Sequence, residues 1–142
     1  MESAVPLAGV RTRCQVGALP WAALTALDLV NKKIVWEVPL GSIEKLMPIP
    51  IPLELGTPGA GGPLVTAGGV VFIGYTLDDS IRAFDLKTGE TLWQADLPAA
   101  GTAVPVTYEA NGEQYVVIAA GGHTMYNTTR GDSVVAFKLP PQ

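Results

Sequence analysis

The chain has 142 residues, of which 48% are hydrophobic and 15% charged, and its 9 basic and 13 acidic side chains give a net charge of −4. The basic residues are scattered and form no stripe, which excludes an electrostatic nucleic-acid-binding surface. Cys14 and His123 are the only residues of their kinds, which excludes an internal disulfide and the usual zinc sites.

The N-terminal part predicts neither an export signal nor a membrane span. Residues 1–15 lack the basic and apolar regions of a signal peptide. The longest apolar window, residues 18–30, is interrupted by Pro20 and Asp28 and is too short to cross a bilayer. We therefore expect no membrane segment in this chain.

Frequent turn formers, 16 glycines and 12 prolines, favour an all-β fold with short strands. A four-stranded β-meander is expected from strands at 63–66, 70–75, 80–86 and 91–97, with positive φ at Gly68, Gly69 and Gly89. A hairpin follows over 104–119, because Asn111-Gly112 is the strongest short signal for a type I′ turn. Residues 133–139 predict a last strand, and no segment of about a dozen residues has helical periodicity.

A sequence repeat relates residues 24–40 to residues 81–97 at an offset of 57 positions. Each copy has Ala to leave room between sheets, Asp to accept turn N–H groups, and Trp to cover the gap to a neighbour. These structural residues are Ala26, Asp28 and Trp36 in the first copy and Ala83, Asp85, Gly89 and Trp93 in the second. Lys32 stands in the place of Gly89, so Asn31 is expected to take the left-handed conformation.

Repeats of four short strands are typical of β-propeller blades, which bury their faces by stacking against like neighbours. The sequence predicts a partial β-propeller of about two to three four-stranded antiparallel blades. We expect a single region, divided into a part-blade at 14–55, a full blade at 56–100 and a part-blade at 101–142. A propeller needs about four to eight blades, so we expect a fragment whose open sheet edges pair with remaining blades or with another copy.

The repeated residues also resemble a known family. The pattern A-x-D-L-x-T-G-x-x-x-W, from Ala83 to Trp93, resembles the tryptophan-docking motif of quinoprotein alcohol and sugar dehydrogenases. The run from Gly56 to His123 and the segment "GDSVVAFKLP" look like the C-terminal segment of the membrane-bound, PQQ-dependent glucose dehydrogenases. Upstream, Cys14, Pro20 and Trp21 fit the same family, although Ala22 stands where glycine is usual.

The resemblance implies an eight-bladed periplasmic propeller that holds pyrroloquinoline quinone (PQQ) and Ca²⁺. Such enzymes oxidise the C1 hydroxyl of an aldose to a lactone and pass the electrons to ubiquinone. In that family most calcium ligands and the principal acid–base residues come from blades absent here. PQQ binding by this chain alone is therefore doubtful. We also expect the chain alone to be inactive. No metal ligand is assigned to it.

Three residues match positions that the family places near the cofactor. The resemblance implies a catalytic role for Asp78 and a cofactor-binding role for His123 and Trp21. The structural alternative for Asp78 is a carboxylate that initiates a turn beside Asp79. For His123 it is a loop histidine bonded to a nearby carbonyl group. The functional alternative to a dehydrogenase is a non-enzymatic β-module that self-associates or completes a partner propeller.

Overall fold

The computed structural model describes residues 10–14, 20–44 and 55–138. Its regular elements in these ranges are ten β-strands: β1 (Val10–Cys14), β2 (Ala22–Asp28), β3 (Lys33–Pro39), β4 (Leu64–Val65), β5 (Val70–Ile73), β6 (Ser80–Asp85), β7 (Thr91–Asp96), β8 (Val106–Ala110), β9 (Glu113–Ala120) and β10 (Ser133–Lys138). The all-β prediction is confirmed. No helix in these ranges is long and apolar enough to cross a bilayer.

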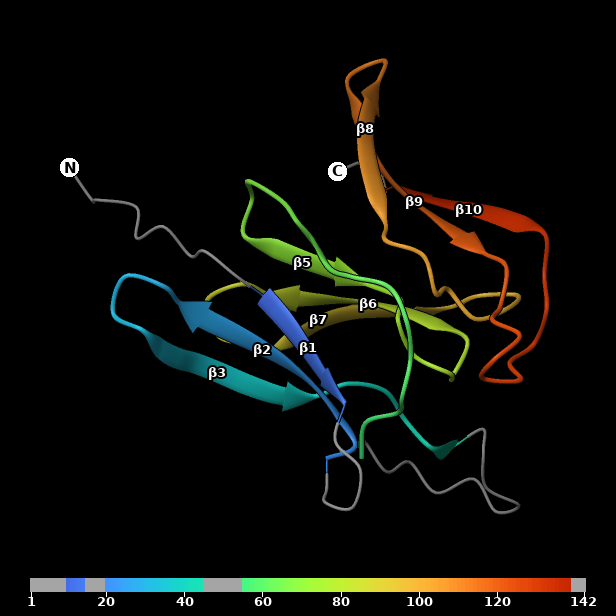
Figure 1. Cartoon of the computed structure of the whole chain (residues 1–142). Helices are drawn as coiled ribbons and strands as arrows, with labels where there is room; N and C mark the ends of the chain where they lie inside the picture. Colours follow the sequence, from blue (N-terminus) through green and yellow to red (C-terminus); the bar gives the residue numbers. More distant parts are fainter. Residues whose placement is uncertain (1–9, 15–19, 45–54, 139–142) are drawn as a thin grey trace.

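The strands form three antiparallel sheets (Figure 1). The first sheet has the order β1-β2-β3, the second β4-β5-β6-β7 and the third β10-β9-β8. The second sheet is the meander predicted for residues 63–97, and β8 and β9 are the strands of the predicted 104–119 hairpin. The last strand begins where predicted, at Ser133, while residue 139 lies outside the described ranges. The unit boundaries at 14–55, 56–100 and 101–142 stay a prediction.

Turn conformations follow the local sequence closely. Asn111 and Gly112 have φ of 53° and 76°, as a type I′ turn requires, and Gly89 has φ of 76°. Of the two glycines before β5, only Gly69 has a positive φ, at 80°. One glycine is sufficient here because Thr66 closes the turn by accepting the Gly69 N–H.

The prediction for Asn31 was wrong, because Lys32 takes the left-handed conformation with φ of 54°. Asn31 instead donates its side-chain N–H to Oδ2 of Asp28 at 2.6 Å. That bond fixes Asn31 inside the turn, so the chain reverses at the position equivalent to Gly89. The repeat therefore places the left-handed residue at position 32, although asparagine adopts that conformation at a lower cost than lysine.

The repeat is visible in the strand pairing. Ala26 pairs with Trp36 in the first sheet, Ala83 pairs with Trp93 in the second, and a β-bulge follows each pair. The alanines are 0% and 3% exposed. A small residue opposite each tryptophan leaves room for the indole ring, and the bulge turns the strand that carries it.

Two apolar clusters hold the sheets together. The first joins the first and second sheets through Ala22, Leu24, Leu40, Val71, Ile73, Tyr75 and Phe84. The second joins the second and third sheets through Ile81, Leu97, Ala99, Val116, Ile118 and Ala120. The second sheet is thus covered on both faces, which agrees with the near-continuous burial of β6.

Candidate functional site

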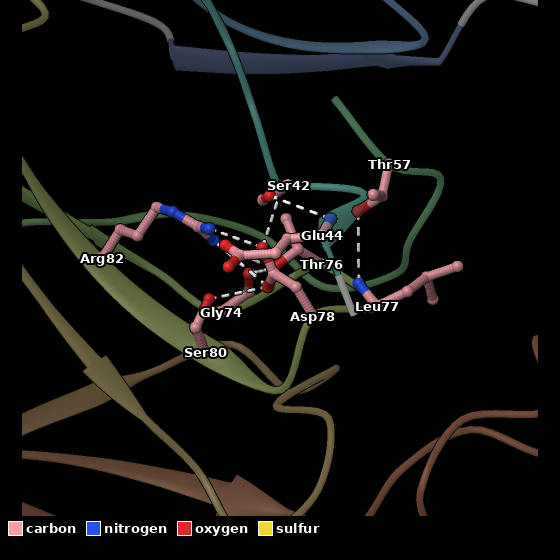
Figure 2. A network of polar contacts seen from close by, with 9 residues as sticks. All are labelled: Ser42, Glu44, Thr57, Gly74, Thr76, Leu77, Asp78, Ser80 and Arg82. Atoms are coloured by element: carbon pink, nitrogen blue, oxygen red, sulfur yellow. Dashed lines mark hydrogen bonds and ion pairs between the residues drawn. The ribbon is translucent and has the colours of Figure 1, made fainter. Parts of the chain in front are cut away.

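The turn between β5 and β6 holds Asp78 in a buried polar network (Figure 2). Asp78 is 3% exposed. Its Oδ1 accepts hydrogen bonds from Thr76 Oγ1 at 2.5 Å and Ser80 Oγ at 2.6 Å. Its Oδ2 accepts from the Ser42 backbone N–H at 2.8 Å and from Nη2 of Arg82 at 2.5 Å. Both carboxylate oxygens are therefore satisfied within the protein.

The electrostatics of this network keep Asp78 ionised. Burial raises the pKa of the carboxyl group, but the hydrogen bond and charge of Arg82 oppose it, together with the bonds from Ser42 and Ser80. The net effect lowers the pKa from 3.8 to about 2. A carboxylate with so low a pKa is a weak proton acceptor at neutral pH.

The same network connects two sheets. Ser42 follows β3 of the first sheet, whereas Asp78 and Arg82 belong to the second. Thr57 strengthens the connection, because its Oγ1 accepts the Leu77 N–H at 3.2 Å (Figure 2). Asp78 therefore fixes how the β5–β6 turn sits against the first sheet.

Asp79 ties the turn to the other side of the molecule. It has φ of 50°, and its carbonyl accepts the Leu97 N–H at 2.7 Å. Its Oδ2 accepts a hydrogen bond from Thr129 Oγ1 at 3.0 Å, in the loop between β9 and β10. Two adjacent carboxylates thus face opposite neighbours, Asp78 the first sheet and Asp79 the third.

His123 lies in the loop that Asp79 contacts. Its backbone N–H donates to Thr128 Oγ1 at 2.7 Å, and its ring lies 5.0 Å from the ring of Tyr126 at an angle of 47°. Tyr126 in turn donates its hydroxyl to the Gly59 carbonyl at 3.2 Å. Nδ1 of His123 is buried and has no hydrogen-bond partner among the residues that the structure describes. A buried ring nitrogen in that state is suited to an additional donor or acceptor.

Trp21 immediately precedes β2 and is 39% exposed. Its backbone N–H donates to the Leu55 carbonyl at 2.8 Å, which fixes the chain entering the first sheet. Within the described ranges no hydrogen bond or ion pair joins any two of Asp78, His123 and Trp21. The three residues come from three different sheets or their loops.

The residues assigned to the repeat lie where a structural role requires. Oδ1 of Asp85 accepts the N–H groups of Lys87 and Thr88, both at 2.8 Å. Oδ1 of Asp28 accepts two turn N–H groups in the same way, each at 2.9 Å. Trp93 makes an edge-on contact with Phe137 of the third sheet, with ring centroids 5.0 Å apart.

Sequence reasoning missed the partner of Asp78. Arg82 is 4% exposed and stands in the middle of β6, between apolar neighbours. A buried arginine needs a nearby counter-charge, and Asp78 precedes it by four residues. In the segment "DDSIRAF", an aspartate four residues before an arginine in an apolar strand was the signal from which this ion pair could have been predicted.

Residues 6–116 match the family described as "PQQ: Glucose/ethanol/alcohol dehydrogenase, beta-propeller domain". The chain belongs to this family. The prediction of a partial β-propeller with the likeness to quinoprotein glucose dehydrogenases is thereby confirmed.

Curated relatives of this propeller family cover most of the chain. It is 48% identical over 124 residues to the quinoprotein glucose dehydrogenase of Escherichia coli (strain K12), which covers 84% of this chain and 16% of that protein. It is 47% identical over 126 residues to the glycerol dehydrogenase large subunit of Gluconobacter oxydans (strain 621H), covering 85% of this chain and 17% of that protein. The chain thus spans about a sixth of the length of these relatives.

A solved relative agrees with the fold. The quinohemoprotein alcohol dehydrogenase from Comamonas testosteroni superposes with a TM-score of 0.61 at 30% identity, over 82% of this chain and 16% of that one. The three sheets are therefore neighbouring parts of a larger PQQ-family propeller, with open sheets at their ends.

PQQ is a flat quinone with three carboxylates, and the chemistry of the described side chains can be compared with it. The exposed ring of Trp21 and the unbonded Nδ1 of His123 have suitable chemistry for a planar, polar ligand. Arg82 does not, because its guanidinium is buried against Asp78. In the described ranges no three His, Cys, Asp or Glu side chains are grouped to hold a metal ion.

Proposed function

We propose that this chain forms part of the propeller of a PQQ-dependent dehydrogenase that oxidises a hydroxyl group of an aldose such as glucose. The 48% identity to the E. coli glucose dehydrogenase carries the proposal. The similar identity to a glycerol dehydrogenase subunit makes a polyol the competing substrate class. The proposal also includes the periplasm as the compartment and ubiquinone as the electron acceptor. The 142-residue chain alone is expected to be inactive.

Within this proposal, Asp78 is a positioning residue. Its low pKa and its bonds to Ser42 and Arg82 favour a role in setting the β5–β6 turn over the catalytic role predicted from the sequence. His123 and Trp21 are proposed to contact the cofactor, His123 through its unbonded Nδ1 and Trp21 through its exposed ring. PQQ, when bound, supplies the hydride acceptor.

A chimera tests the proposal. The matching segment of the E. coli glucose dehydrogenase is replaced by residues 21–138 of this chain, and PQQ-dependent dye reduction is measured with glucose and with glycerol. Turnover with glucose is the expected result. A folded chimera that binds PQQ and oxidises only glycerol would contradict the aldose assignment.

Three variants of the same chimera separate the residue roles. His123→Ala and Trp21→Phe are expected to weaken PQQ binding, measured by titration of the apoprotein, while leaving its unfolding midpoint near that of the parent. Asp78→Asn is expected to lower the unfolding midpoint as well. If His123→Ala leaves the dissociation constant for PQQ unchanged, its cofactor role is wrong.

The alternative proposal is a non-enzymatic β-module that associates through its open sheets. The observation that favours it is the apolar character of the third sheet, where Val106, Tyr108 and Val134 are 56%, 49% and 72% exposed. Side chains of this kind at a sheet surface suit another sheet. Sedimentation equilibrium distinguishes the proposals, since a defined oligomer supports the module and a monomer opposes it.

A further inference from the structure

The imidazole ring of His123 is held in place without a hydrogen bond of its own. Its Nδ1 is buried and unbonded, and among the residues that the structure describes no hydrogen bond reaches the ring. The hydrogen bonds of this residue join its backbone to Thr128. A histidine that acts on a ligand is commonly oriented through a hydrogen bond to one of its ring nitrogens. In His123 a different contact must therefore set the orientation of the ring.

The ring of Tyr126 provides that contact. The centroids of the two rings are 5.0 Å apart and their planes are inclined by 47°. Within the described ranges, His123 contacts no other aromatic ring. Aromatic rings at this separation favour particular relative orientations, so Tyr126 restricts the rotation of the imidazole.

The hydroxyl group of Tyr126 ties this ring to a distant part of the chain. It donates to the Gly59 carbonyl at 3.2 Å, in the segment that connects β3 of the first sheet with β4 of the second. Gly59 is itself packed closely, because a Cβ added there would overlap the Tyr75 carbonyl oxygen. The adjacent Ala60 N–H donates to that same oxygen at 3.2 Å. Tyr126 is thus anchored on backbone that is packed against the second sheet.

The loop that carries His123 is closed without the help of Tyr126. The His123 N–H donates to Thr128 Oγ1 at 2.7 Å, which closes the turn internally. Thr129 Oγ1 donates to Asp79 at 3.0 Å, which attaches the loop to the second sheet. The contacts of Tyr126 are additional to these bonds, and the side chain that its ring restrains is the imidazole of His123.

We propose that Tyr126 is the positioning residue for His123. Its ring sets the orientation of the imidazole, and its hydrogen bond to Gly59 holds that ring in place. The consequence for cofactor binding rests on the proposed contact between His123 and PQQ, whereas the orientation is a property of the free chain. An imidazole that is oriented before the ligand arrives loses less conformational freedom on binding. Loss of Tyr126 therefore weakens cofactor binding although Tyr126 itself is assigned no contact with PQQ.

Proton NMR of the complete 142-residue chain tests the orientation, because His123 is the only histidine and gives a single set of imidazole signals. In the parent chain we expect nuclear Overhauser effects between the two rings and Hα–Hβ couplings of one χ1 rotamer. Tyr126→Phe keeps a ring but loses its anchor, so it should give an intermediate result. Tyr126→Leu should give rotamer-averaged couplings. Averaged couplings in the parent, or unchanged couplings in Tyr126→Leu, would overturn the inference.

Tyr108→Leu is the matched control for these variants. Tyr108 also stacks on an aromatic ring, that of Tyr115, but it belongs to β8. This substitution should leave the His123 signals unchanged. Thermal unfolding of each chain is measured in parallel, and Tyr126→Leu should unfold near the parent because the loop keeps its other bonds. Equal changes of the His123 couplings in Tyr108→Leu and Tyr126→Leu would show general loosening and would refute the positioning role.

Titration of the apo-chimera with PQQ separates this inference from the proposed function. Tyr126→Phe is expected to raise the dissociation constant for PQQ by about fivefold, the effect of losing one neutral hydrogen bond. Tyr126→Leu, which also loses the ring contact, is expected to raise it by about tenfold. If His123→Ala weakens binding while both Tyr126 variants bind like the parent, the cofactor contact stands and the positioning role is wrong. If His123→Ala binds like the parent, the cofactor contact is wrong, and the positioning of His123 is judged from its couplings alone.

Discussion

The indole ring of Trp36 in the first sheet lies on the backbone of Gly89 in the second sheet. A Cβ added at Gly89 would stand 2.7 Å from Cδ2 of that ring, and Nε1 of Trp36 donates a hydrogen bond to the Leu86 carbonyl at 3.0 Å. One side chain thus packs on the neighbouring turn and also satisfies one of its carbonyl groups. Residues 50 positions apart in the chain are joined by this contact.

Replacing Gly89 by alanine should destabilise the fold in two ways. The positive φ of 76° costs about 1–2 kcal/mol for a residue with a Cβ. Displacing the Trp36 ring adds about 1–3 kcal/mol. Gly69→Ala is the matched control, because Gly69 has φ of 80° and a Cβ there would meet nothing within 4 Å. Urea unfolding followed by tryptophan fluorescence measures the free energy of unfolding of both variants. Equal losses of stability in Gly89→Ala and Gly69→Ala would contradict the contact between Gly89 and the Trp36 ring.

Trp36→Phe should lower the free energy of unfolding by about 1 kcal/mol, because it removes the hydrogen bond to the Leu86 carbonyl. Trp93→Phe is the comparison. Its edge-on contact with Phe137 is between rings, and a phenyl ring preserves much of it. The same unfolding measurement should give the smaller loss for Trp93→Phe. A larger loss there would reverse our ranking of the two tryptophans.

Acid should weaken the fold through Asp78. Its pKa in the folded state is about 2, below the ordinary value of 3.8, so the stabilisation is complete above about pH 4 and is lost as pH falls towards 2. This difference between the two pKa values corresponds to about 2 kcal/mol in the free energy of unfolding. Asp78→Asn should flatten the pH dependence of the unfolding free energy in this window. Asp28 and Asp85, whose pKa values are also lowered by turn N–H groups, leave a residual slope.

At neutral pH, Asp78→Asn should lower the free energy of unfolding by about 3–5 kcal/mol, since Arg82 is left buried without its counter-charge. The double variant Asp78→Asn/Arg82→Met removes the unpaired charge and should be less destabilised than Asp78→Asn alone. Chemical unfolding of the three chains at pH 7 checks the order. If the double variant is the least stable, the ion pair is not what holds the turn.

Lys32→Gly should stabilise the chain. Glycine adopts the observed φ of 54° without steric cost, and the gain is partly offset by its greater freedom in the unfolded state. We expect a net gain of about 0.5–1 kcal/mol in the free energy of unfolding. Lys33→Gly, at the first residue of β3, provides the contrast and should destabilise. A loss for Lys32→Gly would contradict the left-handed assignment.

Local sequence was sufficient for the strands from residue 63 onward and for most turns, but it did not predict β1. Asn111-Gly112 and Gly89 have the conformations that their residue types favour, and the Asp–Trp repeat exposed the stacked-sheet architecture. Asn31 was the exception. Its side chain is held by Asp28, and the repeat places the positive φ one residue later, at Lys32.

For the candidate site, less followed from the sequence and more from the tertiary structure. Sequence singled out Asp78, His123 and Trp21 one by one. It did not reveal that Thr76 and Ser80 bind one oxygen of Asp78 while Ser42 and Arg82 bind the other. A pKa depends on burial and on the charges and hydrogen bonds within a few ångströms, and one of these hydrogen bonds, from the Ser42 N–H, comes from a segment 36 positions away. These surroundings support our proposal that Asp78 is a positioning residue.

By itself the sequence determined the all-β class, the strand positions from residue 63 onward and the repeat, because alternation, turn residues and a 57-residue offset are local or self-similar signals. Only the tertiary structure decided which sheet faces which, that Trp36 covers Gly89, and that Asp78 and Asp79 bind opposite neighbours. Those relationships arise from packing between sheets, and packing depends on contacts that no short stretch of chain contains.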